Sequence, residues 1–70
     1  MKGIEFVKRV KALGKSRGIA TELVKGRGKG SHCTIFYGDK RTHIPNLKNE
    51  LKSGTLAAIL RQLGLHLSDL

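Results

Sequence analysis

Acidic residues, aromatic residues and cysteine are all scarce in this 70-residue chain. Aspartate and glutamate together number 5 against 14 lysines and arginines, which gives a formal net charge of +9. That charge exceeds the roughly 2 to 8 that usually keeps a small domain in solution. The imbalance therefore favours a polyanionic partner. Nucleic acid is favoured over a membrane, because neither predicted helix resembles a basic amphipathic anchor with bulky aromatics.

Other absences limit the class of protein. Cys33 is the only cysteine, so an intramolecular disulfide is excluded and nothing indicates an oxidising compartment. The longest apolar run, residues 56–60, is too short to cross a bilayer, and charged residues interrupt the chain from Lys2 onward, unlike the apolar core of a secretory signal. We expect a single domain spanning residues 1–70 in the cytoplasm, without a membrane association.

Two segments have the apolar spacing of amphipathic helices. The first covers residues 4–13, and we expect Gly14 to end it and residues 15–18 to form a polar connection. The second follows Ser53, Gly54 and Thr55, whose hydroxyls are candidate caps, and ends at Gly64. The expected inward residues are Ile4, Phe6, Val7, Val10 and Leu13 in the first helix, and Leu56, Ile59, Leu60 and Leu63 in the second. The tail, residues 65–70, could pack back through Leu65 and Leu67, and Ser68 could begin another helical turn.

Three segments have β patterns. Residues 19–25 form the first, although its inward face is ambiguous because Leu23 and Val24 are adjacent. Residues 32–37 and 40–44 flank a two-residue loop typical of a tight hairpin, and Pro45 stops the last strand. The loop predicts three residue pairs on a face that packs on the helices: Tyr37 with Lys40, Ile35 with Thr42, and Cys33 with Ile44. Phe36 with Arg41 and Thr34 with His43 then pair on the other face, which His32 shares.

The order helix, strand, strand, strand, helix predicts an α+β fold in which both helices cover one face of a three-stranded antiparallel sheet. This is the α-β-β-β-α topology of double-stranded-RNA-binding domains.

The segment between the first two strands combines binding groups with a group that can transfer a proton. Lys25, Arg27 and Lys29 alternate with glycines, and Ser31 and His32 follow directly. Cations can hold a phosphate, and an imidazole gains or loses a proton near pH 7. Two roles are open for the glycines at positions 26, 28 and 30, and they are compatible. The glycines could adopt the positive φ angles of a turn, and they could let main-chain amides approach a phosphate. Lys29 is followed by glycine rather than Ser or Thr, so the spacing of a nucleotide-binding P-loop is not met.

Three motifs, in this order, resemble the HicA toxins of HicA and HicB toxin-antitoxin pairs. They are Lys29-Gly30-Ser31-His32, then Tyr37-Gly38-Asp39, then Leu51-Lys52-Ser53-Gly54-Thr55-Leu56 leading to Leu60-Arg61-Gln62-Leu63-Gly64-Leu65. The resemblance implies a metal-independent endoribonuclease that cleaves mRNA, with the histidine of Gly-Ser-His, here His32, as the catalytic residue. It also implies a HicB-like antitoxin as partner.

From the residues themselves we expect Lys25, Arg27, Lys29, Gly30, Ser31 and Arg41 to bind RNA, and Phe36 to be a candidate for stacking on a base. We expect no metal or small-molecule cofactor, because the three histidines and one cysteine have no recognisable ligand spacing. His43, a diagonal neighbour of His32 at an expected separation of roughly 7 to 8 Å, could act as a second proton-transfer group or be a surface residue. Two alternatives stay open: a non-catalytic RNA-binding module of the same topology, and a structural component of a ribonucleoprotein.

Overall fold

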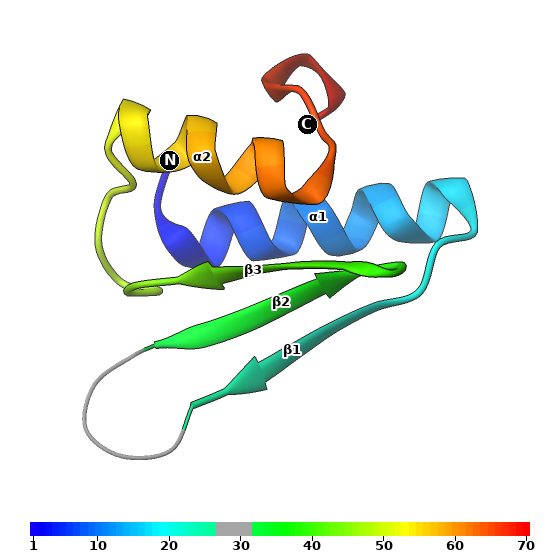
Figure 1. Ribbon diagram of the computed structural model, residues 1–70, viewed down its shortest axis with the longest axis horizontal. Helices are drawn as coiled ribbons and strands as arrows, with labels where there is room; N and C mark the ends of the chain where they lie inside the picture. Colours follow the sequence, from blue (N-terminus) through cyan, green and yellow to red (C-terminus); the bar gives the residue numbers. More distant parts are fainter. Residues whose placement is uncertain (27–31) are drawn as a thin grey trace.

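The computed structural model describes residues 1–26 and 32–70, and it has the predicted order of elements (Figure 1). Helix α1 (Gly3–Arg17) precedes strands β1 (Thr21–Lys25), β2 (Cys33–Tyr37) and β3 (Lys40–Ile44). Helix α2 (Ser53–Leu63) and a short 3-10 helix, η1 (Leu67–Asp69), complete the chain. The predicted small α+β fold with an antiparallel sheet is confirmed.

The sheet has the order β1-β2-β3, and both pairs of strands are antiparallel. Every residue pair predicted for the β2–β3 hairpin is present, because Gly38 adopts a φ of 61° and allows the two-residue turn that sets this register. In β1, Leu23 pairs with Ile35 and is half-buried, whereas Val24 pairs with Thr34 and is 44% exposed. Leu23 is therefore the inward residue that the sequence left ambiguous.

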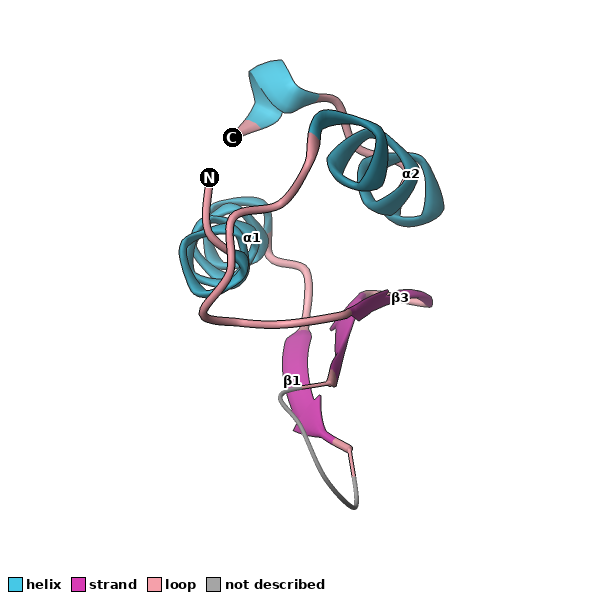
Figure 2. Cartoon of the chain, turned by 90° about the vertical axis from the view of Figure 1, so that its left-hand side faces the viewer, coloured by secondary structure: helices cyan, strands magenta, loops and turns pink. Residues whose placement is uncertain are grey.

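Both helices lie on the same side of the sheet, and the opposite side is left without a helix (Figure 2). The core forms between these two layers, where α1 packs on β1 and β2 and α2 packs on β3. Pro45 follows β3 directly, as predicted for a residue without an amide donor. The buried apolar side chains are Phe6, Val7, Val10, Cys33, Ile35, Tyr37, Ile44, Leu51, Ile59, Leu60, Leu63 and Leu65.

The prediction that Gly14 ends the first helix was wrong, since α1 continues to Arg17. Gly18 takes the left-handed conformation, with a φ of 68°, and its backbone N–H caps the helix. Gly14 is buried inside α1 because the chain returns across it: a Cβ there would overlap the side chain of Thr21 and lie 2.8 Å from the backbone oxygen of Ile19. The sequence shows that position 14 is a glycine. Only the packing reveals that this glycine lets residues 19 and 21 approach the helix closely and does not end the helix.

Three smaller expectations also fail. Helix α2 begins after Lys52 without a side-chain cap, so the hydroxyls of Ser53 and Thr55 do not have the capping role expected of them. Ile4 is 39% exposed although it shares the apolar spacing of α1. In the tail, Leu65 is buried as expected but Leu67 is 56% exposed, because η1 turns Leu70 toward the core in its place.

An ion pair joins the end of α1 to η1. The Arg17 guanidinium donates to Asp69 Oδ1 at 3.1 Å and to the hydroxyl of Tyr37 at 3.4 Å, while the backbone N–H of His66 donates to Asp69 Oδ2 at 2.8 Å. The hydrogen bond from the His66 N–H lowers the pKa of the Asp69 carboxyl most, and the hydrogen bond from Arg17 lowers it further. These contacts fix the C-terminus on the helix side of the molecule, away from the uncovered sheet face.

Among residues 1–26 and 32–70, no helix combines the length and the apolar character that spanning a membrane requires.

Candidate functional site

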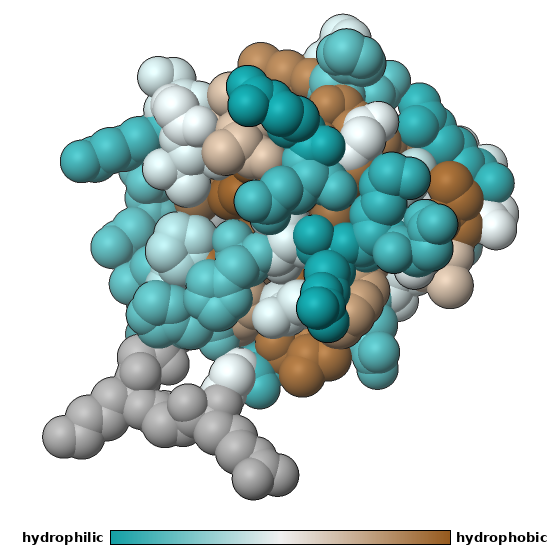
Figure 3. Space-filling view, in the orientation of Figure 1, coloured by the Kyte–Doolittle hydropathy of each residue, from teal (hydrophilic) through white to brown (hydrophobic). Residues whose placement is uncertain are grey.

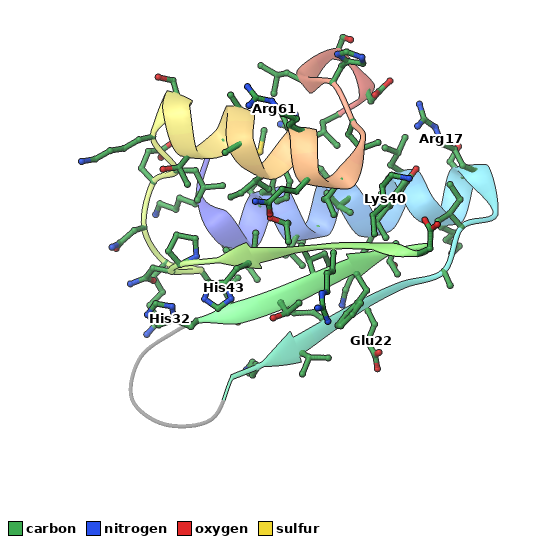
Figure 4. The ribbon with its side chains drawn as sticks, in the orientation of Figure 1. Arg17, Glu22, His32, Lys40, His43 and Arg61 are labelled. Carbon is green, nitrogen blue, oxygen red and sulfur yellow. The ribbon has the colours of Figure 1, made fainter. Side chains whose placement is uncertain are left out.

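The face of the sheet turned away from the helices, here called the open face, carries two histidines whose rings lie side by side. Nδ1 of His32 is 3.0 Å from Nε2 of His43, within hydrogen-bonding distance. The ring centroids are 5.2 Å apart and the rings are tilted by 30°. Both side chains are exposed, so the pair is accessible to a ligand (Figure 4).

The alternation of side chains along the strands explains this pairing. Thr34 lies directly opposite His43, and His32 is two residues before Thr34, which makes the histidines diagonal neighbours on one face. The backbone oxygen of His32 accepts a hydrogen bond of 2.9 Å from the N–H of Gly26. Gly26 therefore anchors the backbone of His32 without placing a side chain beside its ring.

A shallow hollow of about 420 Å³ lies next to His43. Its residues come from all three strands, and α2 adds Gln62, whose side-chain oxygen accepts a hydrogen bond of 2.5 Å from the buried Thr42. Apolar surface in the hollow comes from Val24 and the half-buried Phe36. The residues that line it are Val24, Thr34, Phe36, Arg41, Thr42, His43 and Gln62.

The charge on the open face is mixed rather than uniformly basic. Arg41 is two residues from His43 on β3, so both side chains project from the same face. Glu22 shares that face, and because Glu22 and Arg41 both pair with Phe36 they lie in one cross-strand row, with Glu22 toward the other end of the sheet from the histidines (Figure 4). Within the described strands, Arg41 is thus the cation nearest in register to the histidine pair on this face.

The predicted site residues divide into three groups. His32 and Arg41 lie on the open face with His43 and Phe36, as the register predicted. Lys25 is exposed but pairs with Cys33, so it shares the face of the sheet that packs on the helices and is not brought together with His32. Four predicted RNA-binding residues lie outside the described part of the chain: Arg27, Lys29, Gly30 and Ser31.

The structure also shows how the two rings use their diagonal positions. Diagonal positions are separated by roughly 7 to 8 Å, which by itself would leave room for a phosphate between the side chains. Instead, the rings lean toward each other until their nitrogens are in contact, so a phosphate would have to approach the pair from outside. Gln62 was missed as a contributor to the site, and only its position on α2 beside the edge strand β3 reveals it.

The surface seen in Figure 3 is largely hydrophilic, and hydrophobic surface shows there only in separate areas. In the described ranges, no three histidine, cysteine, aspartate or glutamate side chains gather in a way that could hold a metal ion. From the residues that the structure describes, the open face offers two imidazoles, a guanidinium, the Glu22 carboxylate and a partly apolar hollow.

Fold and site together define a small α+β protein with an exposed histidine pair on the uncovered face of a three-stranded antiparallel sheet. Residues 20–65 match the family model for the HicA toxin of bacterial toxin-antitoxin systems, a span that contains all three strands and α2. The chain belongs to the HicA toxin family, as the sequence motifs indicated. Its role is that of a toxin, and the family implies an antitoxin as partner. Comparisons with curated proteins and with solved structures found no match.

Proposed function

We propose that this toxin is a metal-independent endoribonuclease that cleaves mRNA and uses His32 as its catalytic residue. The observation that carries the proposal is the exposed imidazole of His32 at the end of the open face, with its Nδ1 3.0 Å from Nε2 of His43. Arg41 lies on the same face, two residues from His43 along β3. Membership of the HicA toxin family supports a toxin role, and cleavage of mRNA is an activity that would make the protein toxic.

The chemistry needs few groups, because RNA carries its own nucleophile. His32 takes the proton of the ribose 2′-hydroxyl, the 2′-oxygen forms a bond to phosphorus, and the bond from phosphorus to the 5′-oxygen breaks. The products are a 2′,3′-cyclic phosphate and a 5′-hydroxyl, whose oxygen takes up a proton from water. Arg41 would stabilise the negative charge on the phosphate oxygens, because a guanidinium presents several donors to a phosphate.

The hollow beside His43 suits a nucleotide next to the cleaved bond. Phe36 and Val24 offer apolar contact to the face of a base, and Arg41 lies within the same hollow. We assign the RNA backbone to Arg41 on β3 and to four residues of the basic segment before His32: Arg27, Lys29, Gly30 and Ser31. Lys25, which shares the face that packs on the helices, is left out of this assignment. A HicB-like antitoxin that covers the open face with acidic surface would block both binding and cleavage.

The direct test is cleavage of a defined mRNA transcript by the purified protein in excess chelator. We expect cleavage to persist, because a histidine rather than a metal-bound water transfers the proton, and to stop when the product of the neighbouring antitoxin gene is added. Expression without that partner should arrest growth. Intact transcript in the presence and absence of divalent ions would contradict the endoribonuclease proposal.

RNA binding should weaken steeply as salt rises, since cations that contact phosphates release bound counterions. Replacing Arg41 by alanine should reduce the slope of log affinity against log salt by about 0.7 for single-stranded RNA. Replacing Arg9 by alanine removes the same charge from the exposed surface of α1, where Arg9 pairs with Glu5, and should leave the slope nearly unchanged. Equal slopes for the wild type and the Arg41 variant would remove Arg41 from the contact surface.

A further inference from the structure

We propose that His43 is a positioning residue for His32: its Nε2 accepts the Nδ1 proton of His32, which leaves Nε2 of His32 unprotonated and directed outward as the base. This inference rests on the proposed endoribonuclease function and adds a second residue to its mechanism. It begins from the separation of 3.0 Å between Nδ1 of His32 and Nε2 of His43.

A hydrogen bond between two neutral imidazoles needs one N–H donor and one bare nitrogen acceptor. If His32 donates, its Nδ1 carries the proton and its Nε2 is the basic nitrogen. If His43 donates, Nε2 of His32 carries the proton and cannot accept another. The first arrangement is the one that a base requires, and the contact uses the nitrogen of His32 that the reaction does not need.

The same contact becomes stronger during the reaction. When Nε2 of His32 takes the 2′-hydroxyl proton, the ring becomes an imidazolium and its Nδ1–H becomes a charged donor to His43. Hydrogen bonds with an ionised donor are roughly twice as strong as neutral ones. An interaction that strengthens as the transition state is approached accelerates the chemical step rather than substrate binding.

The surroundings allow this role. Both rings are exposed, so their contact is not forced by burial in the core, and the backbone of His32 is fixed by the N–H of Gly26. Thr34 lies directly opposite His43 and two residues from His32 on the same face, and its half-buried side chain is short compared with the two rings. In the described strands, the charged groups that share this face are Arg41 and Glu22, which both pair with Phe36 and so lie in one row, two residues along the strands from the row of Thr34 and His43.

The kinetic test compares His43→Ala with His43→Gln in the full chain, with steady-state cleavage of a defined transcript measured across pH. The glutamine amide oxygen can take the place of Nε2 as an acceptor, whereas alanine cannot. We expect His43→Ala to lower kcat by about 10- to 100-fold with little change in KM and to alter the pH profile, and His43→Gln to recover most of the loss. In a chain that already carries His32→Ala, adding His43→Ala should cause no further loss.

A second measurement does not depend on activity. In NMR spectra of the imidazole nitrogens at a pH where both rings are neutral, His32 of the wild type should be protonated mainly at Nδ1, and His43→Ala should shift it toward the Nε2-protonated tautomer. An unchanged tautomer, or unchanged kcat and pH profile, overturns the proposal. A glutamine variant as inactive as the alanine variant also overturns it, because His43 would then transfer a proton itself. Absence of RNA cleavage by the wild type refutes the proposed function instead, and the NMR result then still decides whether the pair forms.

Discussion

Replacement of His32 by alanine is expected to lower the rate of RNA cleavage by about 10²- to 10⁴-fold, the usual contribution of a general acid or base. The ring is exposed and its removal leaves the core intact, so the variant should fold like the wild type. RNA affinity should stay nearly unchanged, because under the proposed function it is supplied mainly by cations that contact phosphates. The measurements are the cleavage rate, the affinity for an uncleavable RNA, and growth on expression.

His66→Ala is the matched control, because it also removes one imidazole but lies between α2 and η1, and the backbone N–H that bonds to Asp69 remains. It should cleave RNA and arrest growth like the wild type. Equal loss of binding and cleavage in His32→Ala would favour the non-catalytic RNA-binding module. A wild type that neither cleaves RNA nor arrests growth, but associates stably with large RNA particles, would favour the ribonucleoprotein component.

The second large effect concerns stability, and it contrasts two glycines in helices. Helix propensity alone would make Gly14→Ala stabilising by about 1 kcal/mol. We expect the opposite, a free energy of unfolding lower by about 2 kcal/mol, since the new Cβ overlaps Thr21 and lies 2.8 Å from the backbone oxygen of Ile19. The N–H of Ile19 is bonded to the Gly14 oxygen at 2.7 Å, so this backbone cannot simply move away. In a domain of this size such a loss lowers Tm by roughly 10 °C.

Gly54→Ala is the control, because a Cβ at Gly54 meets nothing within 4 Å. Gly54 lies in the first turn of α2, and its replacement should raise the free energy of unfolding by up to about 1 kcal/mol. Urea and thermal unfolding of both variants provide the measurement. A shift of the same sign in the two variants would show that the close return of the chain across Gly14 does not determine stability there.

The hairpin shows how far a local pattern can predict this protein. Its loop length and alternating side chains were enough to place His32, His43, Phe36 and Arg41 on one face, because a two-residue turn permits a single register and each strand has a period of two. Gly64 was likewise predicted as the end of α2, and it has the expected left-handed conformation.

Glycine at position 14 shows where such reasoning stops. A glycine that ends a helix and a glycine that lets another segment pack closely against the helix have the same local sequence pattern. At position 14 the two cases are distinguished by contacts with Ile19 and Thr21. Lys25 illustrates the same limit: its place in a basic segment suggested that it acts with His32, but the register of β1 puts it on the opposite face. The contribution of Gln62 to the hollow also depends on how α2 packs beside β3.

The sequence by itself determined the order of the elements, the hairpin register, the family motifs and the choice of His32, because each depends on local spacing or on residue identity along the chain. Tertiary structure decided that α1 continues through Gly14, that Lys25 and Arg41 lie on different faces, and that the rings of His32 and His43 are in hydrogen-bonding contact. These features depend on the side-chain directions and packing of segments far apart in sequence, which no local pattern specifies.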